Sequence, residues 1–166
     1  MKKDNSEELF PVVDENCNVI GCATRGECHC GSKLLHPVVH LHVFDSEGRL
    51  YLQRRPQWKD IQPGKWDTAV GGHVDFGENV EMALKREARE ELGLVDFTPV
   101  YLKSYVFESD RERELVNSFK TVVVPSAVNP SDELDGGRWW TAKELSENNE
   151  ELTPNLRYEI DFLKLI

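Results

Sequence analysis

The residues of this chain best suited to chemistry are glutamates within positions 72–94. Glu78 follows a glycine-rich stretch, and Glu87, Glu90 and Glu91 come close together further along. Carboxylates that must stay ionised side by side need a cation between them. Mg²⁺ prefers oxygen ligands and bridges them to substrate phosphates. The pattern therefore predicts a metal site that acts on a phosphate compound.

One helix is expected to carry three of these glutamates. Asn79 can cap its start, and Gly93 supplies the left-handed residue that ends it. At about 100° per residue, Glu87, Glu90 and Glu91 fall within roughly a third of the circumference. The apolar stripe beside them consists of Val80, Leu84, Ala88 and Leu92. Because like charges at these spacings repel, carboxylates bordering the buried face favour a bound cation over a solvated charge run.

The segment 72–94 resembles the Nudix box, the signature of the Nudix hydrolases, at every fixed position. The resemblance implies a loop, a helix and a loop that hold Mg²⁺ or Mn²⁺ against a diphosphate. It also implies a small-molecule substrate, namely a nucleoside diphosphate or a nucleoside diphosphate linked to another group. The residues that match the metal-binding positions are Glu78, Glu87, Glu90 and Glu91.

The same resemblance implies the catalytic roles. Arg86 matches an arginine that orients the box carboxylates. The reaction is hydrolysis of the diphosphate linkage, in which a carboxylate takes a proton from the attacking water. Glu90 is the candidate base within the box, and Glu112 or Glu114 is the candidate in a later loop.

Four residues before or at the start of the box could also meet the substrate. Arg54 and Arg55 follow an expected strand, and arginine can bind phosphate oxygens in pairs; the alternative is an exposed sheet edge. Gly71 and Gly72 are expected in a loop whose backbone approaches the ligand, since glycine allows tight turns.

Stretches outside the box resemble the branch that contains isopentenyl-diphosphate isomerase and its hydrolase-like relatives, including 52–55 and 63–67. The isomerases carry a second metal site. The residues that stand at its positions here are His29, His36, His73, Glu112 and Glu114. Alternate residues on a strand point to the same side, so the two glutamates could reach one ion. The alternative is packed histidines and surface glutamates.

Gly71 separates this chain from the isomerases, which have their catalytic cysteine at that position. Glycine has no side chain to protonate or deprotonate a carbon, and the box here is complete. Isomerase activity is therefore the disfavoured alternative to hydrolysis. A ligand-binding module without catalysis is also disfavoured, because such proteins usually lose box glutamates.

Composition limits the partners and the compartment. The chain has 166 residues, with 20 Lys and Arg against 30 Asp and Glu, for a formal charge of −10. This balance argues against nucleic-acid binding, which needs a basic surface. No apolar run is long enough for a membrane span, and the N-terminus lacks the apolar stretch of a signal peptide. We expect a cytoplasmic protein whose four cysteines are reduced and bind no metal.

An α/β fold is expected to position these residues. The strands are predicted at 10–13, 19–22, 36–44, 49–55, 66–70, 100–107, 115–124 and 137–140, and the helices at 80–92, at 142–148 and from 154 onward. The resemblance implies a Nudix α/β/α sandwich with a mixed sheet. Residues 1–34 would form an N-terminal β-hairpin extension, and 35–166 a single globular Nudix domain. The hairpin could pair with a second copy of the chain, which allows a homodimer.

Overall fold

A long strand, β3 (Leu35–Phe44), organises the molecule. The computed structural model describes residues 5–59, 62–132 and 135–166, so two residues of the loop expected at 56–65 lie outside the described residues. β3 pairs along its whole length with the parallel strand β8 (Arg113–Val122). Its other edge is shared by two antiparallel strands, β6 (Val70–His73) and β4 (Leu50–Arg54).

The remaining strands extend this sheet on both sides. β7 (Val100–Glu108) pairs with β8, while β5 (Trp66–Thr68) and β9 (Gly137–Trp140) both pair with β4. The result is a seven-stranded sheet of order β5-β4-β3-β8-β7, with β6 on β3 and β9 on β4. Since it contains parallel and antiparallel pairs, the predicted mixed sheet is confirmed.

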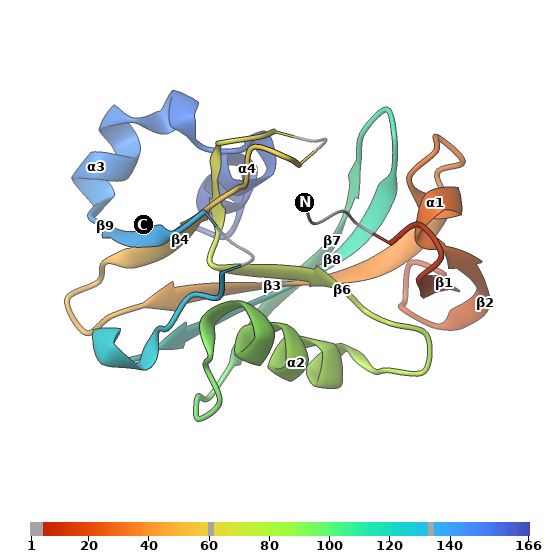
Figure 1. The fold of residues 1–166 in the computed structure, drawn as a ribbon, viewed down its shortest axis with the longest axis horizontal. Helices are drawn as coiled ribbons and strands as arrows, with labels where there is room; N and C mark the ends of the chain where they lie inside the picture. Colours follow the sequence, from red (N-terminus) through yellow and green to blue (C-terminus); the bar gives the residue numbers. More distant parts are fainter. Residues whose placement is uncertain (1–4, 60–61, 133–134) are drawn as a thin grey trace.

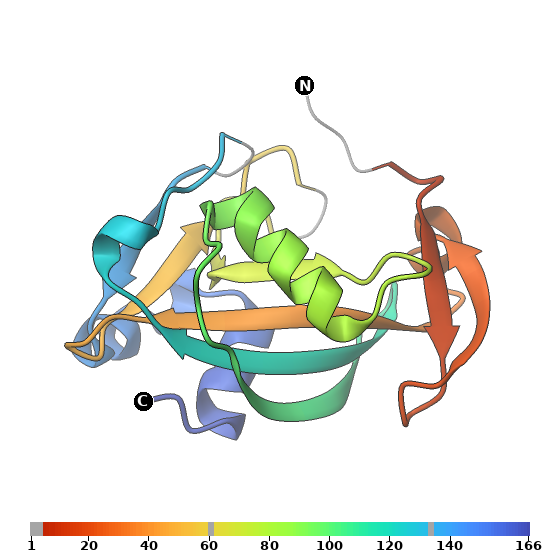
Figure 2. The same cartoon turned by 90° about the horizontal axis from the view of Figure 1, so that it is seen from below.

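Helices cover both faces of the sheet. α2 (Val80–Leu92) lies across one face, as Figure 2 shows, and α4 (Pro154–Phe162) lies on the other (Figure 1). Leu84, Ala88 and Leu92 of α2 are fully buried in the same core cluster as Val39 and Leu41 of β3. The apolar stripe predicted from the sequence is therefore the face that holds α2 on the sheet.

A second apolar cluster anchors the C-terminal layer. Leu156 and Ile160 of α4 are buried with Leu50, Leu52 and Trp140 of the sheet. A short helix, α3 (Ala142–Glu147), connects β9 to this layer, and 3-10 turns lie at Pro125–Ala127 and Asn149–Glu151. The predicted α/β/α sandwich is thus the observed architecture.

The N-terminal hairpin forms a separate two-stranded sheet, as predicted. It consists of β1 (Leu9–Val13) and β2 (Val19–Thr24). A short helix that the sequence reading did not anticipate, α1 (Arg25–Cys28), follows it, and a capping box between Thr24 and Glu27 starts that helix. Figure 1 shows the hairpin and α1 at one end of the main sheet.

The expected loop placement of Gly71 and Gly72 was wrong. Both residues lie in β6, where Gly71 is opposite His40 and Gly72 is opposite Val39 of β3. The predicted strand at 66–70 breaks at Ala69 because the chain leaves β4 and joins β3. The partner strand β3 is about thirty residues away in sequence. Glycines have no side chains, so they form no sequence pattern from which this pairing could be predicted.

Glu114 lies in a strand and not in the later loop where it was expected, because β8 begins two residues earlier than predicted. It lies opposite His36 of β3 in the parallel pair. Within the described ranges, no helix is both long and apolar enough to span a membrane.

Candidate active site

α2 begins and ends where its sequence predicted. Asn79 Oδ1 accepts a hydrogen bond from the backbone N–H of Met82 at 2.8 Å, and Gly93 adopts the left-handed conformation with φ of 61°. Lys85 and Arg89 are exposed on the outer side. The helix directs Glu87 and Glu91 toward β6.

Arg86 connects the carboxylates of the box. Its Nε and Nη2 donate to the two oxygens of Glu78 at 2.7 and 2.9 Å, and its Nη1 donates to Glu87 at 2.7 Å. Nη2 also donates to the carbonyl oxygen of His73 at 3.1 Å. These hydrogen bonds lower the pKa of Glu78. Arg86 thus fastens the loop and the helix to the end of β6.

Glu91 and Glu87 lie directly against the two glycines of β6. Glu91 accepts hydrogen bonds from the Gly71 N–H at 3.3 Å and from Gln53 Nε2 at 3.2 Å. A Cβ atom on Gly72 would overlap the carboxyl group of Glu87. Glycine at 72 is therefore required for this close approach.

Both of these glutamates are costly to ionise in the absence of a cation. Burial raises the pKa of Glu87 to about 7. Burial and the charge of Glu87 raise the pKa of Glu91 well above its ordinary value. A cation beside them would reverse this cost, because an opposite charge favours the ionised form. The donor chemistry of the pair therefore fits Mg²⁺ or Mn²⁺.

The three glutamates of α2 that are predicted to bind metal, Glu87, Glu90 and Glu91, differ in exposure. Glu90 has a side chain that is 50% exposed, whereas that of Glu87 is 15% exposed. Arg86 Nη1 lies 3.3 Å from Glu90. The carboxylate nearest to solvent is thus the one predicted to act as base.

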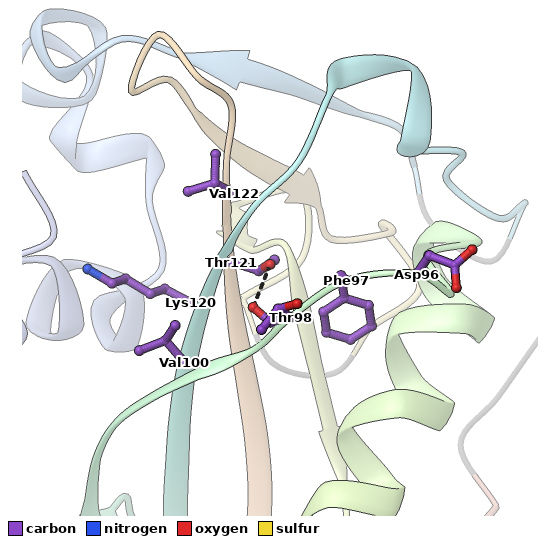
Figure 3. Close-up of a pocket in the computed structure, with 7 residues that line it drawn as sticks. All are labelled: Asp96, Phe97, Thr98, Val100, Lys120, Thr121 and Val122. Atoms are coloured by element: carbon purple, nitrogen blue, oxygen red, sulfur yellow. Dashed lines mark hydrogen bonds between the residues drawn. The ribbon is translucent and has the colours of Figure 1, made fainter.

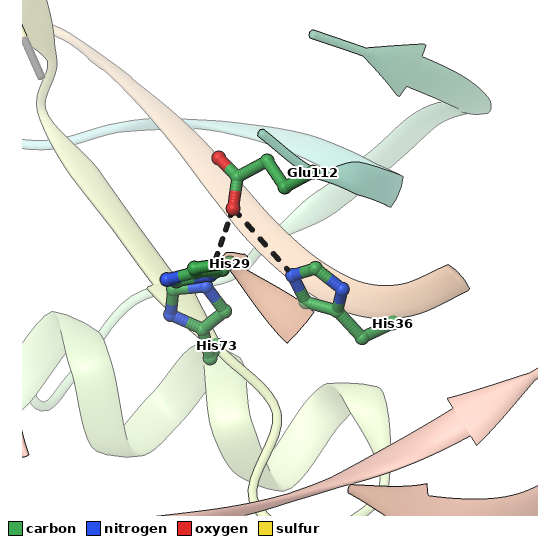
Figure 4. A group of neighbouring side chains, drawn as sticks. All are labelled: His29, His36, His73 and Glu112. Atoms are coloured by element: carbon green, nitrogen blue, oxygen red, sulfur yellow. Dashed lines mark ion pairs between the residues drawn. The ribbon is translucent and has the colours of Figure 1, made fainter. Parts of the chain in front are cut away.

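A second group of potential metal ligands converges more tightly than the box. Four ligand atoms, from His29, His36, His73 and Glu112, all lie within 4.8 Å of one another. Glu112 Oε2 is 2.7 Å from His29 Nε2 and 3.8 Å from His36 Nε2. Figure 4 draws these two ion pairs as dashed lines. Among the described residues, this is the one group of three or more His, Cys, Asp or Glu side chains whose ligand atoms come this close together.

Four elements bring this histidine cluster together. His29 is the C-terminal cap of α1, His36 lies in β3, His73 ends β6, and Glu112 immediately precedes β8. Glu114, the fifth residue predicted here, has its Oε2 3.8 Å from His73 Nε2. The residues that resemblance assigned to one site are therefore neighbours in space.

The histidine cluster has the donor chemistry of a metal site. The Nε2 atoms of its three histidines and Oε2 of Glu112 are buried without a hydrogen bond of normal geometry. Burial lowers the pKa of both His36 and His73. Neutral imidazole nitrogens with free lone pairs are the form that binds metal, so the cluster fits a divalent transition-metal ion.

Phe10 of the hairpin closes one side of this cluster. Its ring stacks on His73 with centroids 4.4 Å apart and lies 5.8 Å from His36. Arg25 covers the Phe10 ring at 5.2 Å. Phe10 is fully buried, so the N-terminal extension takes part in enclosing the histidines.

The two arginines predicted to meet phosphate are partly engaged with the protein. Arg55 Nη1 forms an ion pair with Asp67 at 3.2 Å, and Arg54 Nε donates to the carbonyl oxygen of Gly64 at 3.3 Å. Arg54 is exposed at the end of β4. It borders a surface hollow of about 390 Å³ together with Lys65 and Trp66.

A larger hollow of about 430 Å³ lies elsewhere, between the start of β7 and the end of β8 (Figure 3). Thr121 Oγ1 donates to the Thr98 carbonyl oxygen across its floor at 3.1 Å. Asp96 and Lys120 are its charged lining residues. A single carboxylate and a single amine with apolar neighbours offer no group suited to the chemistry above.

Sequence reasoning missed a third polar group, formed by His40, His42 and Glu159. Glu159 of α4 is fully buried and contacts the rings of both histidines of β3. The two histidines are two apart on a strand and so face the same side, which is a signal that the sequence did contain. Nothing in the sequence pointed to their partner, which is more than a hundred residues away.

Known proteins resemble this chain over most of its length. The family model described as NUDIX domain matches residues 34–161. A protein of Yersinia pestis named as an uncharacterised Nudix hydrolase is 34% identical over 149 residues, which cover 89% of this chain and 81% of that protein. Isopentenyl-diphosphate Delta-isomerase 1 of Photorhabdus laumondii is 31% identical over 163 residues, with 92% of each chain covered.

A solved structure shares the fold. The crystal structure of DR0079 from Deinococcus radiodurans has a TM-score of 0.79 with this chain at 24% sequence identity. The match covers 94% of this chain and 99% of that one. At this identity the likeness concerns the fold alone.

Proposed function

The chain belongs to the Nudix hydrolase family, and from this membership we propose that it hydrolyses a diphosphate linkage with Mg²⁺ or Mn²⁺. The proposed substrate is a nucleoside diphosphate or a nucleoside diphosphate linked to another group. The observation that carries the proposal is the complete box, with Glu87 and Glu91 buried against the two glycines of β6. Relatives that bind without catalysis usually lose such glutamates.

Each box residue has a part in this proposal. Glu87 and Glu91 would hold the metal together with Glu78 and Glu90, and Arg86 keeps Glu78 and Glu87 in place. A bound metal supplies a Lewis acid for the phosphate oxygens and lowers the pKa of a bound water. A carboxylate then accepts the proton of the attacking water.

Glu90 is the preferred base, and Glu114 is the second candidate. Glu90 is half exposed and can reach water. Burial and the charge of Glu112 raise the pKa of Glu114 to about 8, so without a nearby cation this carboxyl holds its own proton at neutral pH. A base must be deprotonated before it can act, which favours Glu90.

The histidine cluster is proposed as a second metal site. Its ligands would be His29, His36 and His73 with Glu112, and Glu114 stands beside them. We further propose that Arg54 or Arg55 contacts substrate phosphate. The cytoplasmic location, the homodimer and the boundary at residue 34 between hairpin and domain stay predictions.

A panel of nucleoside diphosphates and their conjugates, incubated with Mg²⁺, tests the main proposal. Wild-type protein should release phosphate or a nucleoside monophosphate from at least one compound. Replacing a general base costs about 10²- to 10⁴-fold in rate, so Glu90→Gln should lose that much. Glu81→Gln is the matched control. Glu81 is 72% exposed on the same helix and forms a surface ion pair with Lys85 at 3.2 Å. No release from any compound would contradict the function, and full turnover by Glu90→Gln would contradict the base.

Isomerase activity is the second candidate, because the histidine cluster is assembled and one relative carries an isomerase name. Position 71 opposes it, since glycine offers no acid or base there. Incubation with isopentenyl diphosphate separates the two candidates. We expect no isomer to form, and its formation would replace the hydrolase proposal.

A further inference from the structure

Glu159 links two histidines of the central strand to the C-terminal helix. Its carboxylate accepts hydrogen bonds from His40 Nδ1 and from His42 Nε2, the latter at 3.1 Å. Glu159 and His42 are fully buried, whereas the side chain of His40 is 13% exposed. Of the two histidines, His40 is therefore the one that can meet a ligand.

The open side of His40 faces Gly71. The two residues are opposite each other in the β3–β6 pair. A Cβ atom on Gly71 would stand 3.5 Å from Cδ2 and 3.9 Å from Nε2 of His40. Because glycine has no such atom, the ring edge that carries Nε2 is uncovered at this point of the strand.

Gly71 also connects this ring to the box. Its backbone N–H donates to Glu91 Oε2 at 3.3 Å. Gly71 thus donates its backbone N–H to Glu91 of the box, and the His40 ring lies next to the place where a side chain on Gly71 would begin.

The electrostatics of His40 suit an anionic ligand. Burial alone would lower its pKa, but the charge of Glu159 and their hydrogen bond outweigh it and raise the pKa to about 9. The ring is then a cation at neutral pH, with Nδ1–H held by Glu159 and Nε2–H available to donate. Hydrogen bonds from a charged donor to phosphate are among the stronger ones in proteins.

We infer that His40, oriented by Glu159, binds the diphosphate of the substrate through Nε2 on the side of β6 away from α2. This inference rests on the proposed function for the presence of a diphosphate. It adds a substrate-binding residue from outside the box and assigns the buried Glu159 a positioning role. The competing explanation is that the three residues only join α4 to the sheet.

Binding of methylenediphosphonate, a diphosphate that cannot be hydrolysed, tests the inference in the presence of Mg²⁺. His40→Asn keeps a donor near the position of Nδ1 but removes Nε2, and we expect Kd to rise about 10- to 100-fold. His40→Gln places a donor near Nε2 and should recover part of the affinity. His42→Gln is the matched control, since His42 contacts the same carboxylate but is fully buried, and its Kd should stay within about threefold of wild type.

Equal losses in the His40→Asn and His42→Gln proteins would show a structural role and overturn the inference. Should His40→Asn fail to fold, the imidazole ¹⁵N signals of the wild-type protein provide the test. The His40 Nε2 signal should move on adding methylenediphosphonate with Mg²⁺ and not with Mg²⁺ alone; an unmoved signal contradicts the inference. Hydrolysis of the panel with no effect at His40 would overturn this inference alone, whereas diphosphonate binding without hydrolysis would overturn the proposed function alone. If the protein neither hydrolyses a panel compound nor binds the diphosphonate, the proposed function and this inference are both contradicted.

Discussion

At the scale of single residues, Gly72 is where the backbone and the box meet. The carboxyl group of Glu87 occupies the space that a Cβ atom would fill. We expect Gly72→Ala to displace Glu87 and lower kcat by about 10²-fold, because a displacement of about 1 Å at a catalytic site costs that much.

Gly21→Ala is the matched control for this substitution. Gly21 lies in the hairpin strand β2, and a Cβ atom there would meet nothing within 4 Å. Steady-state kinetics on a hydrolysed panel compound compares the two variants. Unchanged turnover by Gly72→Ala would show that the position of Glu87 is not critical.

The raised pKa of Glu87 predicts how metal binding depends on pH. Because its pKa is about 7, the group is mostly protonated at pH 6 and mostly ionised at pH 8, and metal binds the ionised form. The ionisation of Glu87 alone should therefore make Mg²⁺ affinity about tenfold higher at pH 8 than at pH 6. Calorimetric titration at the two pH values checks this, and Glu87→Gln should reduce the difference to the part that comes from Glu91. An affinity independent of pH would contradict the assignment of Glu87 as a ligand.

The residues of the site were predictable to different degrees for physical reasons. The box glutamates and Arg86 are close in sequence, so helix periodicity alone places them together. His40 belongs to a pattern visible on β3, but its meaning depends on Glu159, which only the packing of α4 supplies. Gly71 and Gly72 were expected in a loop, since strand pairing with a distant partner has no local signature.

At the scale of elements, the same contrast separates α2 from β6. Capping by Asn79 and termination by Gly93 are local, so the bounds of α2 agreed with the sequence. The division of 66–73 into β5 and β6 arises because β4 and β3 each take one part. Local propensity describes helices with clear caps better than strands whose partners lie far along the chain.

The hairpin is the element whose contribution to the site is most open to test. Phe10 of β1 stacks on His73 and is fully buried, while its neighbour Leu9 is 49% exposed. Removing a buried phenylalanine side chain costs about 3–5 kcal/mol and opens the histidine cluster to water. We expect Phe10→Ala to weaken Co²⁺ binding to the protein by tenfold or more.

Leu9→Ala serves as control for the hairpin, because it changes the same strand on its exposed side. Co²⁺ titrations followed by visible absorption compare both variants with wild type, and His36→Ala identifies the signal of the cluster. Equal Co²⁺ affinity in the Phe10→Ala and wild-type proteins would mean that the hairpin does not support the cluster.

At the scale of the whole molecule, the three polar groups surround one short strand. The box meets β6 through α2, the histidine cluster includes its last residue His73, and His40 lies opposite Gly71. The sheet and its two helical layers therefore bring together residues from both halves of the chain. A fold of this kind lets distant segments contribute to one site, which is why residue spacing alone predicted only the box and the histidine cluster was predicted from resemblance.

The ion pair between Glu159 of α4 and His40 of the sheet should affect the stability of the whole protein. The pKa of His40 is raised from its ordinary 6.5 to about 9, so its ionised pair with Glu159 contributes fully below about pH 6.5 and is lost as pH rises through about 9. The pKa of Glu159 is lowered, since the charge of His40 outweighs the effect of burial, so the contribution is also lost in strong acid. Breaking a buried ion pair costs about 3–5 kcal/mol, and Glu159→Gln should lower the free energy of unfolding by about that amount at pH 7.

This loss should shrink toward pH 10, where His40 is neutral in the wild-type protein and the charged pair no longer exists. Urea denaturation at both pH values measures it, because the difference between variant and wild type cancels groups that titrate alike in both proteins. Glu147→Gln is the control, since Glu147 forms an exposed pair with Lys143 at 3.9 Å on α3 and should change stability little at either pH. A Glu159→Gln loss of equal size at pH 7 and pH 10 would mean that α4 is held by packing and neutral hydrogen bonds rather than by the charge on His40.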